Sequence, residues 1–529
     1  KNIRNCPDPY EVAEGGHFLQ EWGVDVATRA IAAWSAEAKT RRENQTLLKP
    51  ARMTGQNVLV IVSDEHTREA LGCYGADHMH TPNIDGLARR GTRFSHAYTP
   101  SPICVPARAC IATGTYVHQN RCWSNAQPYH GQVTGWGHRL IENGHRVVSV
   151  GKLHHRSSRD DNGFDTEIMP LHVKDGIGWA RGLLGRNGSS WDAAAHFAEE
   201  IGPGLCDYNQ YDMEISAAAC QWLRHEATKD PEKPWVLYAS FVSPHYPLIV
   251  PQRYFDLYPP SQIEPPRLNT PTDHSEHPVL QAMRHYLNYD DFFDDQSRQV
   301  AKASYLGLCS FLDDHVGALI DALHDSGQYD NTLIIYTSDH GEMAGNHGLW
   351  TKCVMYEESA GIPLILSGPS VPKGEVRSTQ ASLVDLHPTI LQATGLGLSR
   401  DDLDLPGCSL LDLIDGETPN RLVLSEYHDG GSITGMFMIR REQFKYVCYP
   451  GYPPQLFDLE KDPYESTDLA PEAAYQQEVQ ACHRALCTLV DPERANELAF
   501  SDQSARISEL GGRKAIESME NFDQSPVPH

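Results

Sequence analysis

The stretch Asn57–Val62 reads NVLVIV and runs directly into Ser63-Asp64-Glu65-His66. A short, continuous apolar run that ends in polar residues is typical of a strand buried inside a parallel sheet. Three further runs have the same form: RVVSV before Gly151-Lys152-Leu153-His154-His155, WVLYASFV before Ser243-Pro244-His245, and NTLIIY before Thr337-Ser338-Asp339-His340-Gly341-Glu342. One such cluster alone is more often a solvated loop. Because ligands of open α/β sheets bind at the carboxyl ends of the strands, we expect the four clusters to meet in one crevice.

Residues 53–415 are predicted to form an α/β domain. Strand-like runs, including PLIL at 363–366, alternate there with amphipathic stretches. The predicted helices lie at 81–90, 211–225, 302–326 and 385–394. This alternation favours a large, mixed, mostly parallel sheet between helices.

The two ends of the chain differ from this domain. Residues 416–529 predict a smaller α+β subdomain with an antiparallel sheet, a helix at 473–490 and a polar tail. Its four short strands are expected at 422–427, 436–440, 445–449 and 455–458. Residues 1–52 predict an N-terminal helical extension, because apolar residues recur at near-helical spacing within 17–42.

Composition excludes several classes of partner. The chain has 529 residues, with 44 Lys+Arg against 70 Asp+Glu, which gives a net charge of −26. Such a charge repels nucleic acid and anionic membrane surfaces, so neither is expected as a partner. No apolar run reaches the roughly 20 residues of a membrane span, and no signal peptide is visible in the given chain. Thirteen cysteines without CxxC spacing favour a reducing compartment, so we expect a cytoplasmic protein.

The segment Cys104-Val105-Pro106-Ala107-Arg108 is the fifth candidate element of the site. Proline is favoured in the first turn of a helix, so Cys104 is predicted to lie at or just before a helix N-terminus. Unpaired backbone N–H groups favour an anion there, and Arg108 adds a charged donor. For a lone cysteine, a buried thiol beside a helix is the more common interpretation.

This segment resembles the Cys-x-Pro-x-Arg signature of the type I sulfatases. It follows Ser101-Pro102-Ile103 and precedes Ala-x-x-x-Thr-Gly, as in that family. Further segments resemble family motifs in the expected order: Thr81–Ala88, Gly151-Lys152-x-His154, Pro244-His245-x-Pro247, Asp339-His340-Gly341, His347–Lys352 and Leu456–Glu465. The resemblance therefore runs from about Asn57 to Leu469 and implies an alkaline-phosphatase-like fold.

The chain departs from the common family pattern at three places. It has Asp64-Glu65 where many members have Asp-Asp, and Gly361 where an Arg is frequent. It also has Asp339-His340 where many members have Asp-Asn. The Asp-His pair is more similar to choline-sulfatase-like enzymes and to phosphonate monoester hydrolases.

The resemblance implies that Cys104 is oxidised to formylglycine by a formylglycine-generating or anaerobic maturation enzyme. Asp64, Glu65, Asp339 and His340 are then the predicted ligands of one divalent metal. Carboxylates with one imidazole suit Ca²⁺, Mg²⁺ or Mn²⁺. The other predicted catalytic residues have separate roles: Arg108 orients the formylglycine, Lys152 and Lys352 clamp the transferred group, His154 acts as a base, and His245 donates near the leaving oxygen.

The leading interpretation is hydrolysis of a small anionic sulfate ester through a covalent sulfo-enzyme intermediate. The first alternative is a phosphonate monoester or phosphodiester hydrolase that uses the same site. The second is an inactive anion-binding homologue with an unmodified Cys104. A homo-oligomer is expected from the terminal segments, and four aromatic residues are candidates to line the leaving-group pocket: Trp123, Tyr129, Trp136 and Trp350.

Overall fold

The structure is a computed structural model that describes residues 55–187, 194–229, 232–270, 272–416, 418, 421–520 and 524–528. The predicted helical extension at 1–52 lies outside the described residues. Gly55–His529 form one compact unit. The boundary expected near residue 415 therefore stays a prediction.

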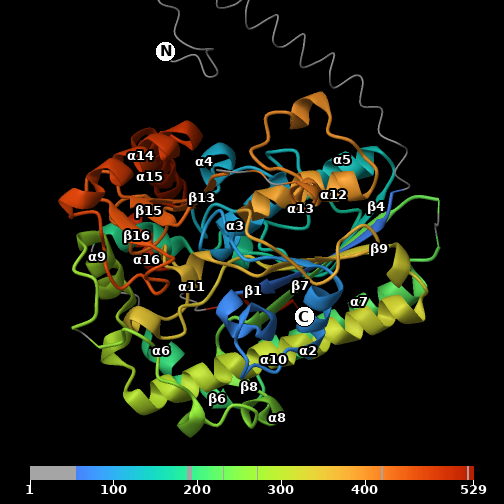
Figure 1. Cartoon of the computed structure of the whole chain (residues 1–529), viewed down its shortest axis with the longest axis horizontal. Coiled ribbons are helices and arrows are strands. Elements are labelled where there is room, and N and C mark those ends of the chain that lie inside the picture. The colour runs from blue at the N-terminus through green and yellow to red at the C-terminus, as the bar shows by residue number, and fades with distance from the viewer. Residues whose placement is uncertain are drawn as a thin grey trace, which may run out of the picture. The chain divides into compact units, whose positions relative to one another are not determined.

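An eight-stranded sheet lies at the centre of this unit (Figure 1). Its strand order is β11-β2-β10-β9-β1-β7-β4-β5. The bounds are β1 Asn57–Asp64, β2 Thr92–Phe94, β4 Arg146–Lys152, β5 Thr166–Leu171, β7 Trp235–Pro244, β9 Thr332–Ser338, β10 Leu364–Ser367 and β11 Glu375–Arg377. The five strands from β9 to β5 run parallel, and β10 runs antiparallel to both of its neighbours. The predicted mixed, mostly parallel sheet is confirmed.

Helices cover both faces of the sheet. Successive side chains of β1 point to opposite faces, so they pack in two different cores. Val58, Val60 and Val62 pack in a core with α5 (Trp136–Glu142), α12 (Leu386–Ala393) and α13 (Leu410–Asp415). Leu59 and Ile61 pack on the other face. There they meet three helices: α2 (Pro82–Arg90), α7 (Asp207–His225) and α10 (Asp295–Asp325). This α/β/α layering leaves the strand ends as the place where polar side chains can meet.

The C-terminal part carries a separate four-stranded antiparallel sheet, as predicted. Its strands are β13 Val423–Tyr427, β14 Met436–Arg441, β15 Phe444–Cys448 and β16 Gln455–Asp458. The helices α14 (Gln476–Leu489), α15 (Pro492–Glu509) and α16 (Arg513–Glu517) follow. Helix α15 lies in the region predicted to be a polar tail and was not predicted as a helix. That helix buries mainly small residues, such as Ala495 and Ala499, and so shows no apolar stripe in the sequence.

Three buried charged residues and the half-buried Arg68 form a group of ion pairs that we call the junction cluster: Arg68, Glu357, Lys445 and Glu465. Lys445 Nζ lies 3.1 Å from Glu357 Oε1 and 2.9 Å from Glu465 Oε1. Arg68 forms an ion pair with the other oxygen of Glu357. A Cβ atom at Gly361 would lie 2.9 Å from Arg68 Cζ and 2.6 Å from the Glu357 carbonyl oxygen. The guanidinium of Arg68 therefore lies beside Gly361.

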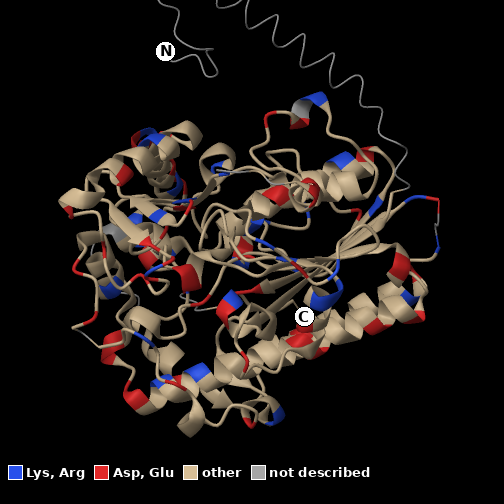
Figure 2. Cartoon of the chain, in the orientation of Figure 1, with Lys and Arg blue, Asp and Glu red and all other residues tan. Residues whose placement is uncertain are grey.

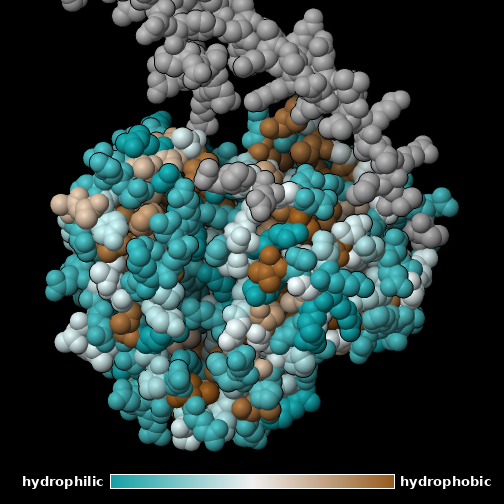
Figure 3. Space-filling model, in the orientation of Figure 1, coloured by the Kyte–Doolittle hydropathy of each residue, from teal (hydrophilic) through white to brown (hydrophobic). Residues whose placement is uncertain are grey.

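The surface matches the acidic composition. Figure 2 shows acidic residues, with a few basic ones, along the long helix α10, and Figure 3 shows a face that is mostly hydrophilic with apolar residues between. None of the helices among the described residues is long and apolar enough to cross a membrane. The homo-oligomer stays a prediction.

Candidate active site

Five elements bring the predicted residues together. Asp64 ends β1, Lys152 ends β4, and Asp339 directly follows β9. His245 directly follows β7, and Cys104 is the first residue of α3 (Cys104–Thr113). The expected convergence at the carboxyl ends of the strands is confirmed, as is the position of Cys104 at a helix N-terminus.

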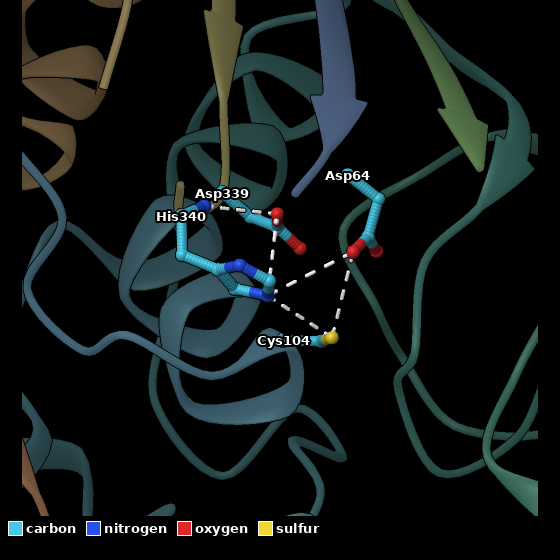
Figure 4. Close-up of side chains that lie close together, drawn as sticks. All are labelled: Asp64, Cys104, Asp339 and His340. Carbon is cyan, nitrogen blue, oxygen red and sulfur yellow. Dashed lines mark hydrogen bonds and ion pairs between the residues drawn. The ribbon is translucent and has the colours of Figure 1, made fainter. Parts of the chain in front are cut away.

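Four buried side chains form what we call the metal group: Asp64, Cys104, Asp339 and His340 (Figure 4). One ligand atom from each lies within 4.8 Å of the others. Cys104 Sγ is 3.2 Å from His340 Nε2 and 3.6 Å from Asp64 Oδ1. His340 Nε2 is 3.7 Å from Asp64 Oδ1 and 3.6 Å from Asp339 Oδ1.

The geometry of the metal group fits a divalent cation. His340 Nδ1 lies 3.1 Å from the Gly341 carbonyl oxygen, a contact that orients the ring. The other ring nitrogen, Nε2, faces carboxylate oxygens of Asp64 and Asp339. Acceptors that converge in a buried space need a cation between them. Two carboxylates and one imidazole suit a hard or borderline ion such as Mg²⁺, Ca²⁺ or Mn²⁺.

Two cations hold the acidic side of the metal group in place. Arg108 Nη2 lies 3.0 Å from Asp64 Oδ2, and Arg108 Nε lies 2.8 Å from Asp339 Oδ2. Lys152 Nζ lies 2.6 Å from Asp64 Oδ2. Burial alone would raise the pKa of Asp64, but Lys152, His245 and Arg108 together hold that pKa well below its ordinary value. Asp64 is therefore an anion, and its Oδ1 stays directed at Cys104 and His340.

Glu65 lies on the other side of Asp64. Its Oε2 is 3.1 Å from Lys352 Nζ and 3.4 Å from His245 Nε2. The Lys352 ammonium is in turn 2.9 Å from His245 Nε2. Glu65 belongs to a second group of ligand atoms with Asp64 and His245, while Asp64 is shared by both groups. The role of Glu65 as a metal ligand stays a prediction.

His154 faces the same space without a partner. It is 7% exposed, and neither ring nitrogen has a hydrogen-bond partner among the described residues. Burial, together with the nearby charges of Lys152 and Arg108, lowers the pKa of His154 well below its ordinary value. A neutral imidazole with a free nitrogen is suited to accept a proton.

Cys104 is a protonated thiol in this setting. Burial, with the Asp64 carboxylate next to it, raises the pKa of Cys104 to about 12. A protonated thiol is a weak nucleophile, because the thiolate is the reactive form. An unmodified Cys104 is therefore poorly suited to attack an ester.

A pocket opens over Cys104. Besides Cys104, its lining includes four of the predicted side chains: Lys152, His154, His245 and Lys352. Four aromatic residues and two residues of the C-terminal segment also line it: Trp179, Tyr208, Tyr246, Tyr289, Gln524 and Ser525. Tyr208 fixes that segment, because its hydroxyl donates to the Ser525 carbonyl oxygen at 2.9 Å.

The four aromatic residues that the sequence offered for the pocket lie elsewhere. Trp123, Tyr129, Trp136 and Trp350 are buried in the cores and do not line the pocket. Trp136, for example, packs on Phe164 and Tyr238 beneath the sheet. Of the four aromatic residues that do line it, Trp179, Tyr208, Tyr246 and Tyr289, only Tyr246 lies inside a motif segment, Pro244-His245-x-Pro247. The others come from loops and helices whose placement depends on tertiary packing.

Fold and site together define an alkaline-phosphatase-like hydrolase, with a nucleophile position at a helix N-terminus and a metal group beside it. Residues 56–396 match the family model described as Sulfatase, and residues 345–491 match the model described as N-sulphoglucosamine sulphohydrolase, C-terminal. The chain belongs to the sulfatase family and is a sulfuric ester hydrolase.

Relatives of known name agree with this assignment. The chain is 31% identical over 422 residues to the choline-sulfatase of Rhizobium meliloti (strain 1021), which covers 78% of this chain and 82% of the relative. It is 30% identical over 489 residues to human arylsulfatase K, which covers 87% of this chain and 86% of the relative. The phosphonate monoester hydrolase of Agrobacterium radiobacter superposes with a TM-score of 0.68 at 25% identity, over 82% of this chain and 95% of that one.

Proposed function

We propose that the chain hydrolyses sulfate esters at residue 104 after its conversion to formylglycine, with one divalent metal held by Asp64, Asp339, His340 and residue 104. The single observation that carries this proposal is the metal group itself, in which three ligands converge on Cys104, a residue that lines the pocket. The metal, once bound, would polarise the ester oxygens and lower the pKa of the attacking hydroxyl. A hydrated formylglycine would supply two hydroxyls on one carbon, one to attack sulfur and one to expel the sulfate later.

The remaining residues have roles that follow from their positions. Lys152 and Lys352 line the pocket and would neutralise the non-bridging oxygens of the sulfate. Arg108 fixes both carboxylates of the metal group, so it orients the ligands around residue 104. His154 would accept the proton that is lost when sulfate is expelled. His245 and Lys352 form a pair that would stand at the leaving oxygen.

The pocket wall favours an alcohol that stacks on aromatic rings. Trp179, Tyr208, Tyr246 and Tyr289 line the pocket, and aromatic side chains suit a flat apolar group or a quaternary ammonium group. The relative from Rhizobium meliloti is named a choline-sulfatase. We therefore propose choline sulfate and aryl sulfates as the first substrates to assay.

Peptide mass spectrometry across Cys104 tests the modification. The chain should be produced with and without a formylglycine-generating enzyme, and 4-nitrophenyl sulfate turnover should follow the fraction of formylglycine. Equal turnover by a fully unmodified chain would overturn the mechanism. The metal is tested separately by elemental analysis, since Asp339→Ala should lose bound metal as well as rate. An unchanged metal content in that variant would mean that the site is misplaced.

A second candidate is hydrolysis of phosphonate monoesters or phosphodiesters at the same site. The Asp339-His340 pair and the similarity to the Agrobacterium radiobacter enzyme favour it. Sulfate and phosphonate esters are both tetrahedral anions, so one site can accept both. Values of kcat/KM on matched aryl sulfate and phenyl phosphonate esters would rank the two activities, and much faster phosphonate turnover would reverse our order.

Three further proposals concern the setting of the enzyme. The cysteines in the described part of the chain are all free thiols, which supports a reducing compartment such as the cytoplasm. A maturation enzyme is the required partner if residue 104 is formylglycine. A homo-oligomer is tested by light scattering of the purified chain.

A further inference from the structure

The buried carboxylate of Asp212 binds the end of β7. Asp212 lies on α7 and is fully buried. The Val242 N–H donates to its Oδ1 and the Ser243 N–H donates to its Oδ2, both at 2.7 Å. Two short bonds from consecutive amides to one carboxylate fix both the position and the direction of the chain there.

The sheet explains why these two amides need an acceptor. The parallel ladder between β1 and β7 pairs Val62 with Ser240 and then shifts register before Asp64 pairs with Pro244. On the other side, the ladder between β4 and β7 ends at the pair Gly151 and Ser240. The amides after Ser240 therefore leave both ladders inside a buried region. A buried N–H without an acceptor is costly, and Asp212 supplies the missing acceptors.

The segment that Asp212 holds carries His245. The His245 N–H donates to the Val242 carbonyl oxygen at 3.0 Å, so the turn begins at the residue that Asp212 binds. His245 Nδ1 lies 2.6 Å from the Tyr246 carbonyl oxygen. The other ring nitrogen, Nε2, then lies 2.9 Å from Lys352 Nζ, and both residues line the pocket.

We propose that Asp212 is a positioning residue for expulsion of the leaving group: it fixes the turn that sets His245 against Lys352, whose ammonium would donate the proton to the leaving oxygen. This inference rests on the proposed function, in which that pair stands at the leaving oxygen. Asp212 would act without contacting the substrate. A shift of about 1 Å in a catalytic group can cost about 100-fold in rate, which is how a residue outside the pocket can act on the chemistry.

Asp313 provides a matched control. It lies on α10, is fully buried, and accepts the Asn83 and Ile84 N–H groups at 3.1 and 2.8 Å at the start of α2. Asp212 and Asp313 thus bind backbone in the same way, but only Asp212 binds the segment that leads to His245. Substitution by Asn keeps the size of either side chain and removes one acceptor oxygen.

The experiment measures kcat/KM of the full-length, formylglycine-containing enzyme on two esters. One is 4-nitrophenyl sulfate, whose leaving group needs little help, and the other is an alkyl sulfate, whose leaving group needs a proton donor. We expect Asp212→Asn to lower kcat/KM about 10- to 100-fold on the alkyl ester and less than about threefold on the aryl ester. Asp313→Asn should lower the melting temperature by about as much as Asp212→Asn does. It should leave the ratio of the kcat/KM values on the two esters unchanged.

A double variant separates this inference from the proposed function. In a His245→Ala background, Asp212→Asn should have no further effect on either ester. An equal loss on both esters, or an additive loss in the double variant, would overturn the positioning role. If His245→Ala itself shows no dependence on the leaving group, the role proposed for His245 fails. The effect of Asp212→Asn in that background would still decide whether Asp212 acts through His245.

Discussion

The metal group and the junction cluster both bury several charged side chains, yet they are built in opposite ways. In the junction cluster each of the four carboxylate oxygens has a partner. Glu357 binds Lys445 through one oxygen and Arg68 and Tyr98 through the other. Glu465 binds Lys445 through one oxygen and accepts the Glu357 N–H at 2.6 Å through the other.

The active site lacks this closure. Both ring nitrogens of His154 are without a hydrogen-bond partner among the residues that the structure describes. His154 also lines the pocket. The difference teaches that buried charge alone does not mark a functional site. Acceptors left unmatched beside a pocket do, because they need a ligand that the chain does not supply.

The largest expected effect comes from Cys104 and distinguishes the metal group from the junction cluster, because it changes turnover and not stability. Cys104→Ala should lower 4-nitrophenyl sulfate turnover by about 10⁴-fold or more, because the nucleophile is lost. Its melting temperature should stay close to that of the parent enzyme, since the metal group is not needed to close the fold. Cys110→Ala is the control: Cys110 is buried on the same helix, and its loss should cost stability and leave turnover intact. Comparable turnover in the two variants would contradict the assignment of residue 104.

A substitution in the junction cluster should lower stability and leave turnover unchanged. Lys445→Met leaves Glu357 and Glu465 buried without their shared cation, which should lower the free energy of unfolding by about 3–5 kcal/mol. The kcat/KM of the folded fraction should be unchanged, because no junction residue lines the pocket. Urea unfolding followed by tryptophan fluorescence measures the first quantity and aryl sulfate turnover the second. A loss of kcat/KM without a loss of stability would show that the two clusters are coupled.

Lys352 is a buried lysine with a carboxylate partner, like Lys445. Its substitution tests whether it serves catalysis or only the stability of the fold. Lys352→Ala should raise the barrier for sulfate ester hydrolysis by about 2–4 kcal/mol, the usual size of one lost transition-state contact. Steady-state kcat/KM on 4-nitrophenyl sulfate measures it. A variant that loses stability but keeps its rate would place Lys352 with the structural lysines.

The smallest expected effect is a change of stability with pH. Burial, with the Glu357 carboxylate beside it, raises the pKa of Glu465 to about 8. A carboxyl whose pKa is raised in the folded state stabilises the fold most below its ordinary pKa, and it loses that contribution as pH rises. The parent enzyme should therefore lose stability between about pH 5 and pH 8. Glu465→Gln should show a flatter profile in urea titrations over this window, and parallel profiles would contradict the prediction.

Much of the fold could be predicted because each buried strand is recognisable from its own short stretch of sequence. NVLVIV and its three counterparts are short apolar runs, and the sheet contains each of them within two residues of the predicted bounds. The helix α15 was missed because its buried face is made of small residues, which carry little hydropathy signal. Likewise, nothing in the sequence showed that β10 runs antiparallel, since direction depends on pairing with distant strands.

The site could be predicted to a similar extent, and for a related reason. Residues inside motif segments, such as Lys152 and His245, converge as expected, because each directly ends or follows a strand. The pocket wall could not be predicted. Trp179, Tyr208 and Ser525 come from a loop, a helix and the end of the chain, and only packing brings them to Cys104. Asp212 was also missed, since its role depends on a register shift in the neighbouring strand.

The contact of Arg68 with Gly361 has a consequence for how this branch of the family can change over time. No side chain fits at Gly361 while the Arg68 guanidinium and the Glu357 carbonyl oxygen keep their places. A side chain at position 361 would require both the Arg68 guanidinium and the Glu357 backbone to move. The two positions should therefore covary when related sequences are aligned, with an Arg at one of them and a small residue at the other.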